Sequence, residues 1–135
     1  MARGKGKNII LVADDDFFFR TLIRNCVADY ADVIEVKNGS EVLEHYAEHT
    51  PDMIFLDIHM PDAQGTDILS EIMKRDPQAF VVMVSADSVT EKVLGTKQQG
   101  AKGFIGKPFK RDTILRYLTA CPTLNLHDAA QKSAP

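Results

Sequence analysis

The sequence predicts an α/β domain built on a doubly wound parallel sheet of five strands with five helices. Two observations lead to this fold class. Short apolar runs of strand length alternate with segments whose apolar residues recur at helical spacing. In addition, the run over 53–56 is apolar on both faces, as expected of a central parallel strand that helices cover on both sides.

Length and charge limit the possible classes of protein. The 135 residues match one compact domain, expected over 8–120, and leave no room for a second. A formal net charge of −3 gives no general electrostatic reason to expect direct binding to nucleic acid. Residues 1–7 are predicted to be a flexible basic leader, and residues 121–135 a loose tail.

Neither the cysteines nor the apolar runs point to a secreted or membrane protein. Cys26 and Cys121 have no metal-ligand or CxxC spacing, so we expect them to be reduced packing residues. No apolar run approaches the length of a membrane span, and the amino terminus lacks a signal-peptide core. The sequence therefore predicts a cytoplasmic protein without a membrane partner.

The first strand is expected over 8–13, and a helix capped by Asp16 over 16–29. The buried stripe of this helix consists of apolar residues at helical spacing, which are Phe19, Leu22, Ile23, Cys26 and Tyr30. Phe17 and Phe18 lie off this stripe, and two adjacent exposed aromatic residues favour docking of a partner helix. Alternatively, one of them folds back over the helix start as a staple.

A short second strand over 33–36 leads into a helix that begins at Ser40, its expected cap, and ends before Pro51. The central strand covers 53–57, and Pro61 with the polar residues around it predicts a loop.

The remaining elements are a helix over 66–75, a strand over 80–84, a helix over 87–99, a strand over 103–105 and a helix over 110–120. Gly95 lies inside the fourth helix, where glycine costs roughly 1 kcal/mol relative to alanine. This helix is therefore expected to be the weakest, with Gly100 at its carboxyl end.

Four of the expected strands end in chemically useful residues. These are Asp14, Asp15 and Asp16 after the first, Asp57 at the end of the third, Ser85 and Ala86 after the fourth, and Lys107 and Pro108 after the fifth. In a parallel sheet such ends share one edge, and ligands bind beyond it. Taken alone, however, Asp57 could equally end a strand or cap the next element.

Three carboxylates from neighbouring strand ends would repel one another, by about 4 kcal/mol for two charges 4 Å apart at an effective dielectric constant of 20. A hard divalent cation would neutralise them, and a pocket of carboxylates, a carbonyl and water suits Mg²⁺, with Mn²⁺ as a substitute. The alternative is that the acids at 14–16 only begin a helix.

Four motifs in this sequence, taken together and in their order, resemble those of response-regulator receiver domains. They are the acid pair Asp14-Asp15, the run Asp-Ile-x-Met-Pro-x-x-x-Gly that begins at Asp57, the pair Ser85-Ala86, and the pair Lys107-Pro108. Receiver domains are the phospho-accepting modules of bacterial two-component signalling. The resemblance covers about residues 8–119 and implies a flavodoxin-like fold with strand order 2-1-3-4-5. It implies a domain that takes a phosphoryl group from a histidine kinase or a histidine phosphotransfer protein and switches a protein-binding surface.

The resemblance also implies roles for individual residues. Asp57 is the phosphorylation site, Asp15 and Asp57 bind Mg²⁺ directly, the backbone carbonyl of His59 is a third ligand, and Asp14 acts through water. Lys107, before a cis peptide bond, neutralises the phosphoryl group. The Ser85 hydroxyl completes the site.

Further implied roles concern control and output. His59 and Asp87 lie at positions that influence the lifetime of the phosphoryl group, although His59 could instead be a solvent-facing side chain without a role. Ser85 and Phe104 are the residues expected to switch conformation on phosphorylation. The expected output face, which binds the downstream protein, consists of the fourth helix, the fifth strand and the fifth helix. Phe104 could alternatively be an ordinary core residue.

Other functional hypotheses remain open at this point. Asp14-x-Asp16 after an apolar strand resembles the motif of haloacid-dehalogenase-like phosphatases, which would turn over exogenous phosphate esters. A flavodoxin-like FMN binder would need Ser, Thr and Gly donors where the first loop carries acids. The chain could also be an excised receiver of a multidomain regulator, and either a monomer or a phosphorylation-dependent homodimer.

Overall fold

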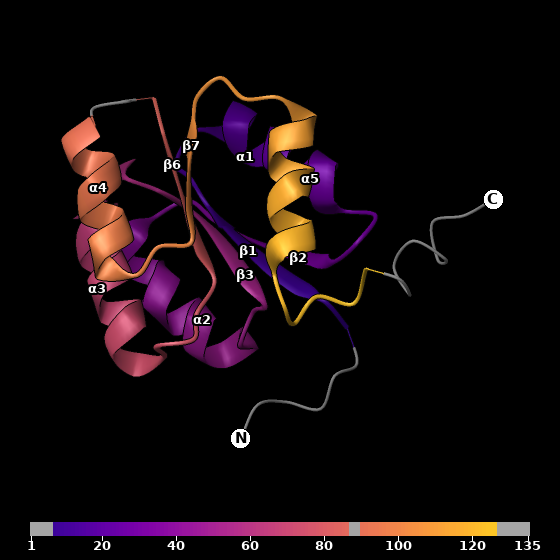
Figure 1. The fold of residues 1–135 in the computed structure, drawn as a ribbon, viewed down its shortest axis with the longest axis horizontal. Coiled ribbons are helices and arrows are strands. Elements are labelled where there is room, and N and C mark those ends of the chain that lie inside the picture. The colour runs from indigo at the N-terminus through magenta and orange to yellow at the C-terminus, as the bar shows by residue number, and fades with distance from the viewer. Residues whose placement is uncertain (1–6, 87–89, 127–135) are drawn as a thin grey trace.

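Five parallel strands form one sheet in the computed structural model, which describes residues 7–86 and 90–126 (Figure 1). The strands are β1 (Ile9–Ala13), β2 (Asp32–Val36), β3 (Met53–Asp57), β6 (Val81–Ser85) and β7 (Gly103–Gly106). Their order, β2-β1-β3-β6-β7, is the predicted order 2-1-3-4-5, because β4 (His59–Met60) and β5 (Ala63–Gln64) form a separate hairpin. Most of the predicted leader, much of the predicted tail, and Asp87 lie outside the described residues.

Helices cover both faces of the sheet. They are α1 (Phe17–Val27), α2 (Val42–His49), α3 (Gly65–Arg75), α4 (Thr90–Gln99) and α5 (Arg111–Ala120). Helices α1 and α5 lie side by side over one face, and α2, α3 and α4 lie over the other (Figure 1). The predicted doubly wound architecture is therefore confirmed.

The central strand β3 is buried along its whole length. Its side chains alternate between two hydrophobic cores. Ile54 and Leu56 join the core that includes residues of α2 and α3, whereas Met53 and Phe55 join the core that includes residues of α1 and α5. Packing on both faces fixes this strand and positions Asp57 at its carboxyl end.

Two predicted helix ends are confirmed. Asp16 caps α1, because its Oδ1 accepts a hydrogen bond from the backbone N–H of Phe18 at 2.9 Å. Gly100 follows α4 with φ of +112°, a conformation that favours glycine. By contrast, a Cβ atom at Gly95 inside α4 would meet nothing within 4 Å, so packing does not require glycine there.

Ser40 does not cap the second helix, contrary to the prediction. It lies within a 3₁₀ turn, η1 (Gly39–Glu41), and α2 begins at Val42. The backbone N–H groups of Gly39 and Ser40 instead donate to the carboxylate of Asp62 at 2.8 and 2.9 Å. The segment containing Asp62 was expected to be a loop, but it forms the hairpin of β4 and β5.

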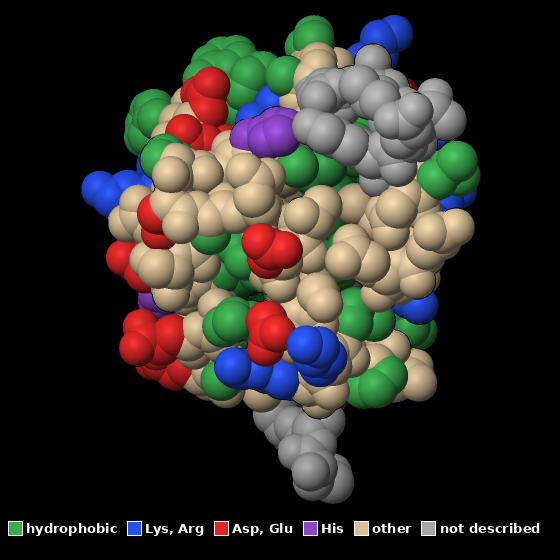
Figure 2. Space-filling model, turned by 90° about the vertical axis from the view of Figure 1, so that its left-hand side faces the viewer, with side chains coloured by type: hydrophobic (Ala, Val, Ile, Leu, Met, Phe, Trp, Pro, Cys, Tyr) green, Lys and Arg blue, Asp and Glu red, His purple; other side chains and the backbone are tan. Residues whose placement is uncertain are grey.

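On the side of the molecule that carries α3 and α4, uncharged polar side chains and backbone cover most of the surface, with an acidic side chain near the centre and a group of acidic and basic side chains below it (Figure 2). Leu94, on α4, is an exposed large apolar side chain. Both cysteines are buried and free, as expected of packing residues. Within the described parts of the chain, no helix combines the length and the apolar character needed to cross a membrane.

Candidate functional site

Three carboxylates meet at the carboxyl edge of the sheet. Asp14 and Asp15 follow β1, and Asp57 ends the neighbouring strand β3. One oxygen atom of each lies within 4.8 Å of those of the other two. Asp14 and Asp57 are buried, whereas Asp15 is exposed. The fold therefore brings together the three acids that the sequence suggested as metal ligands.

The backbone around Asp57 lies against the start of α3. The Gly65 N–H donates to the carbonyl oxygen of Ile58 at 2.6 Å. A Cβ atom at Gly65 would lie 2.4 Å from the Asp57 carbonyl oxygen and 2.7 Å from Ile58 Cα. Neither atom belongs to a flexible side chain that could move aside. Close approach of two backbone segments therefore requires glycine at this position of the motif.

Lys107 brings a cation to the carboxylates from the end of β7. Its Nζ lies 2.9 Å from Asp14 Oδ2 and 3.6 Å from Asp57 Oδ2, and its side chain is only 8% exposed. The ammonium also lies 4.8 Å from the centre of the Phe19 ring, a cation–π contact. The peptide bond between Lys107 and Pro108 is cis, as the resemblance implied.

The single ammonium does not neutralise the cluster. Burial, and after it the charge of Asp14, raises the pKa of Asp57 to about 7, although Lys107 acts in the opposite direction. Asp14 Oδ2 is buried and makes no hydrogen bond, since its contact with Lys107 is an ion pair without hydrogen-bond geometry. Carboxylate oxygens with unused acceptor capacity and excess negative charge fit a hard divalent cation such as Mg²⁺.

Ser85 lies on β6, which pairs with β3, and Phe104 lies on β7, the strand beyond β6. Ser85 is fully buried at the end of β6, where its carbonyl oxygen accepts the N–H of Lys107 at 2.8 Å. Its neighbour Val84 pairs with Asp57 in the sheet. Phe104, on β7, is half-buried and packs against the core that includes residues of α2 and α3. The end of β6 thus connects the acid cluster to β7.

Two aromatic side chains stand at the mouth of the site. Phe17 and Phe18 are 70% and 63% exposed, as expected from their place outside the apolar stripe of α1. The edge of Phe18 contacts Phe19, with ring centres 5.1 Å apart, and Phe19 is the ring beside the Lys107 ammonium. Phe18 is therefore continuous with the site, whereas the centre of the Phe17 ring lies 5.5 Å from the Arg20 guanidinium.

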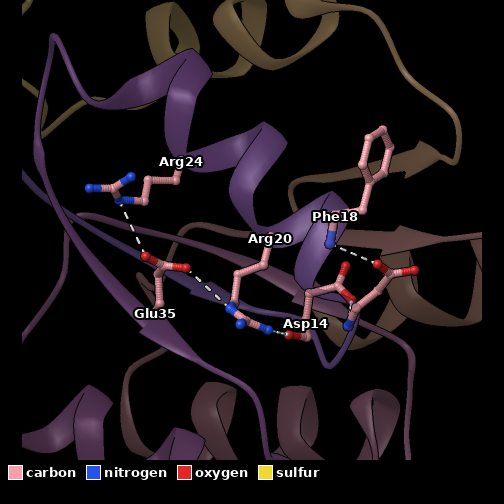
Figure 3. Close-up of polar contacts among 6 residues, drawn as sticks. Asp14, Phe18, Arg20, Arg24 and Glu35 are labelled. Carbon is pink, nitrogen blue, oxygen red and sulfur yellow. Dashed lines mark hydrogen bonds and ion pairs between the residues drawn. The ribbon is translucent and has the colours of Figure 1, made fainter.

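Arg20 is a residue near the site that the sequence did not reveal (Figure 3). Its Nη1 donates to the Asp14 carbonyl oxygen at 2.8 Å, and its Nε pairs with Glu35 at 3.1 Å. Arg24 pairs with the other oxygen of Glu35 at 3.2 Å. The guanidinium thus ties the loop that carries two of the acids to α1 and β2. No local signal separates Arg20 from an ordinary surface arginine, because its partners lie on other elements.

Comparison with known proteins decides among the remaining hypotheses. The family model for the response regulator receiver domain matches residues 10–119. The chain is a response regulator receiver domain. It is similar to the chemotaxis protein CheY of Listeria monocytogenes, with 42% identity over 111 residues that make up 81% of this chain and 93% of that protein. Against CheY of Bacillus subtilis the identity is 39% over 118 residues, covering 86% of this chain and 97% of the relative.

A similar solved structure is a complex of CheX with CheY, BeF₃ and Mg²⁺ from Borrelia burgdorferi, with a TM-score of 0.79 and 31% identity over 84% of this chain and 87% of the matched chain. The receiver family binds Mg²⁺ at an acidic pocket, and in this chain the acids at 14, 15 and 57 lie together, with ligand atoms within 4.8 Å of one another. The phosphatase and flavin-binding hypotheses find no support in these matches. The receiver domain is a signalling module, and its family acts with histidine kinases and downstream proteins.

Proposed function

We propose that Asp57 accepts the phosphoryl group, delivered by a histidine kinase or a histidine phosphotransfer protein. The observation that carries this assignment is the placement of its carboxylate, buried at the end of β3 with Lys107 Nζ at 3.6 Å. The other two acids are less suited as acceptors. Asp14 is ion-paired with Lys107 at 2.9 Å, and Asp15 is exposed to water.

In the transfer, a carboxylate oxygen of Asp57 attacks phosphorus, the bond from phosphorus to the donor's leaving atom breaks, and an acyl phosphate forms. Lys107 provides a fixed ammonium beside the phosphoryl oxygens. The Ser85 hydroxyl donates a hydrogen bond to another of them. The domain would catalyse only its own phosphorylation and dephosphorylation, without turnover of a separate substrate.

Mg²⁺, or Mn²⁺ in its place, would supply neutralisation of charge on the phosphoryl oxygens. Asp15 and Asp57 would be its direct ligands, with the His59 carbonyl as a third and Asp14 acting through water. The grouping of the three acids within 4.8 Å supports this set. So does the unsatisfied Oδ2 of Asp14, which has capacity for a bound water.

The output is proposed to be a change in the surface of α4, β7 and α5. A phosphoryl group at Asp57 would draw the Ser85 hydroxyl toward it, and Phe104 would fill the space that Ser85 vacates. The Phe104 side chain is half-buried in this structure, which leaves it able to turn further inward. In a Ser85→Ala variant, Asp57 should still accept phosphate, but the chemical-shift changes at Phe104 should weaken. Full-sized changes there would contradict the switch.

Phe17 and Phe18 are proposed to dock the phosphoryl donor protein. Both rings are exposed, Phe18 contacts Phe19 beside Lys107, and Phe17 lies against the Arg20 guanidinium, which supports a role in recognition. Replacing both with serine should slow transfer from the donor protein and leave labelling by acetyl phosphate unchanged. A parallel loss of both rates would show that these rings serve the fold.

His59 and Asp87 are proposed to set the lifetime of the phosphoryl group. The support for His59 is its position two residues after Asp57, with an exposed side chain on the β4–β5 hairpin. Substitution of either residue should change the rate of hydrolysis more than the rate of phosphorylation. A cytoplasmic location, in reach of a histidine kinase, belongs to the same proposal.

Labelling with a small phosphodonor tests the central assignment. Incubation with acetyl phosphate and Mg²⁺ should add one phosphoryl group, measured by intact mass, and EDTA should prevent it. Asp57→Asn should abolish the added mass, whereas the matched control Glu71→Gln, a surface carboxylate on α3, should retain it. Undiminished labelling of the Asp57→Asn variant would refute the proposal.

A further inference from the structure

A second group of metal-ligand side chains lies on α2, away from the acid cluster. His45, Glu48 and His49 each offer a ligand atom, and these atoms lie within 4.8 Å of one another. The two histidines are four residues apart, so they project from the same side of the helix. Because α2 ends at His49, shortly before β3 begins at Met53, the group lies toward the amino edge of the sheet. The acid cluster lies at the opposite, carboxyl edge.

The side chains already face one another. The rings of His45 and His49 are nearly parallel, with an interplanar angle of 6° and centres 5.7 Å apart. His49 Nε2 lies 3.9 Å from Glu48 Oε2, which is too far for a hydrogen bond. His45 Nδ1 is buried and has no hydrogen-bond partner among the described residues. An unsatisfied buried nitrogen is unfavourable, and coordination of a cation would give it a partner.

We propose that His45, Glu48 and His49 bind a divalent transition-metal ion such as Zn²⁺, Ni²⁺ or Cu²⁺. Two imidazoles with one carboxylate form a donor set that these ions prefer, and Zn²⁺ uses the same ligand types in proteins. Bonds of about 2.0–2.2 Å require ligand atoms closer than the present spacing, and rotation of side chains at the surface covers the difference.

The position of the group on α2 also favours a cation. His49 is the last residue of the helix, where the carbonyl ends of the aligned peptide dipoles carry partial negative charge. Glu48 adds a full negative charge beside the two rings. Mg²⁺ prefers oxygen ligands, so the group on α2 and the acid cluster should select different ions.

Binding can be measured separately at the two sites. With excess MgCl₂ present to occupy the acid cluster, titration of ZnCl₂ followed by calorimetry should show one ion bound per chain. Cu²⁺ added to ¹⁵N-labelled protein should broaden the amide signals of residues 42–52 first. His45→Gln and His49→Gln should each weaken Zn²⁺ binding by more than about tenfold, since each removes a ligand. Glu71→Gln, a surface carboxylate outside the group, should bind as the wild type does.

Other results would overturn the proposal. Broadening centred on residues 13–15 and 57–59 would place the ion at the acid cluster instead. Loss of binding in His127→Gln, with no loss in His45→Gln or His49→Gln, would place the ion on His127 instead. As a control for folding, each variant with weakened Zn²⁺ binding should keep the far-UV circular dichroism spectrum of the wild type. This inference does not depend on the phosphorylation of Asp57.

Discussion

Replacing Asp57 with asparagine is expected to stabilise the metal-free protein at alkaline pH. Burial and the charge of Asp14 raise the pKa of Asp57 from 3.8 to about 7. Because the folded-state pKa lies above the unfolded value, the unfolded chain releases this proton first as pH rises. The free energy of unfolding therefore falls between pH 3.8 and about 7 and stays lowered above that range.

The shift sets the size of the effect. At about 1.36 kcal/mol per pH unit, a rise in pKa from 3.8 to about 7 corresponds to at most about 4 kcal/mol. Asparagine keeps the shape of the side chain without its charge, but it also removes one partner of Lys107. We therefore expect Asp57→Asn to raise the free energy of unfolding by about 2–4 kcal/mol at pH 8, and by less than about 2 kcal/mol at pH 5.

Urea unfolding in EDTA at the two pH values measures this difference. Glu71→Gln provides the control, because its carboxylate is at the surface, and its effect should stay within about 0.5 kcal/mol. Excess MgCl₂ should stabilise the wild type more than the variant, since an ion that binds only the folded state raises stability. An Asp57→Asn variant that is no more stable than the wild type at pH 8 in EDTA would refute the reasoning.

Three further predictions concern the surrounding framework. Gly65→Ala should lower the free energy of unfolding by about 3 kcal/mol or prevent folding, because its Cβ would lie 2.4 Å from the Asp57 carbonyl oxygen; a fully stable variant by urea unfolding would contradict this contact. Gly95→Ala should instead raise the free energy of unfolding by about 0.5–1 kcal/mol, because the added Cβ meets nothing within 4 Å and α4 gains a better helix former. A destabilised variant would show that α4 needs glycine. Arg20→Met should lower the free energy of unfolding by about 1–3 kcal/mol and weaken Mg²⁺ binding, because the Asp14 carbonyl loses its 2.8 Å donor. Unchanged Mg²⁺ affinity by calorimetry would mean that Arg20 does not position the acids.

The sequence was sufficient to predict the sheet and most helices because their signals are local. The apolar run before Asp57 contains enough information to identify a buried parallel strand, and the strand ends then place Asp57, Asp14 and Lys107 on one edge. Asp16 was recognised as a cap because a cap depends on residues within one turn.

The features that the sequence did not reveal depend on contacts between distant segments. The N–H groups of Gly39 and Ser40, in the 3₁₀ turn before α2, are satisfied by Asp62, more than twenty residues away, so the local cue at Ser40 is misleading. Arg20 acquires its role from a carbonyl group and from Glu35 on another element. The need for glycine at position 65 also becomes clear only when α3 lies against the end of β3.

Chemical trapping of the acyl phosphate tests the assignment of Asp57 most directly. Borohydride reduces an aspartyl phosphate to homoserine, and fragmentation of the digested protein by mass spectrometry then shows which residue was converted. After incubation with acetyl phosphate and Mg²⁺, we expect homoserine at position 57 and unaltered aspartate at positions 14 and 15. Conversion at Asp14 or Asp15 with Asp57 intact would contradict the account.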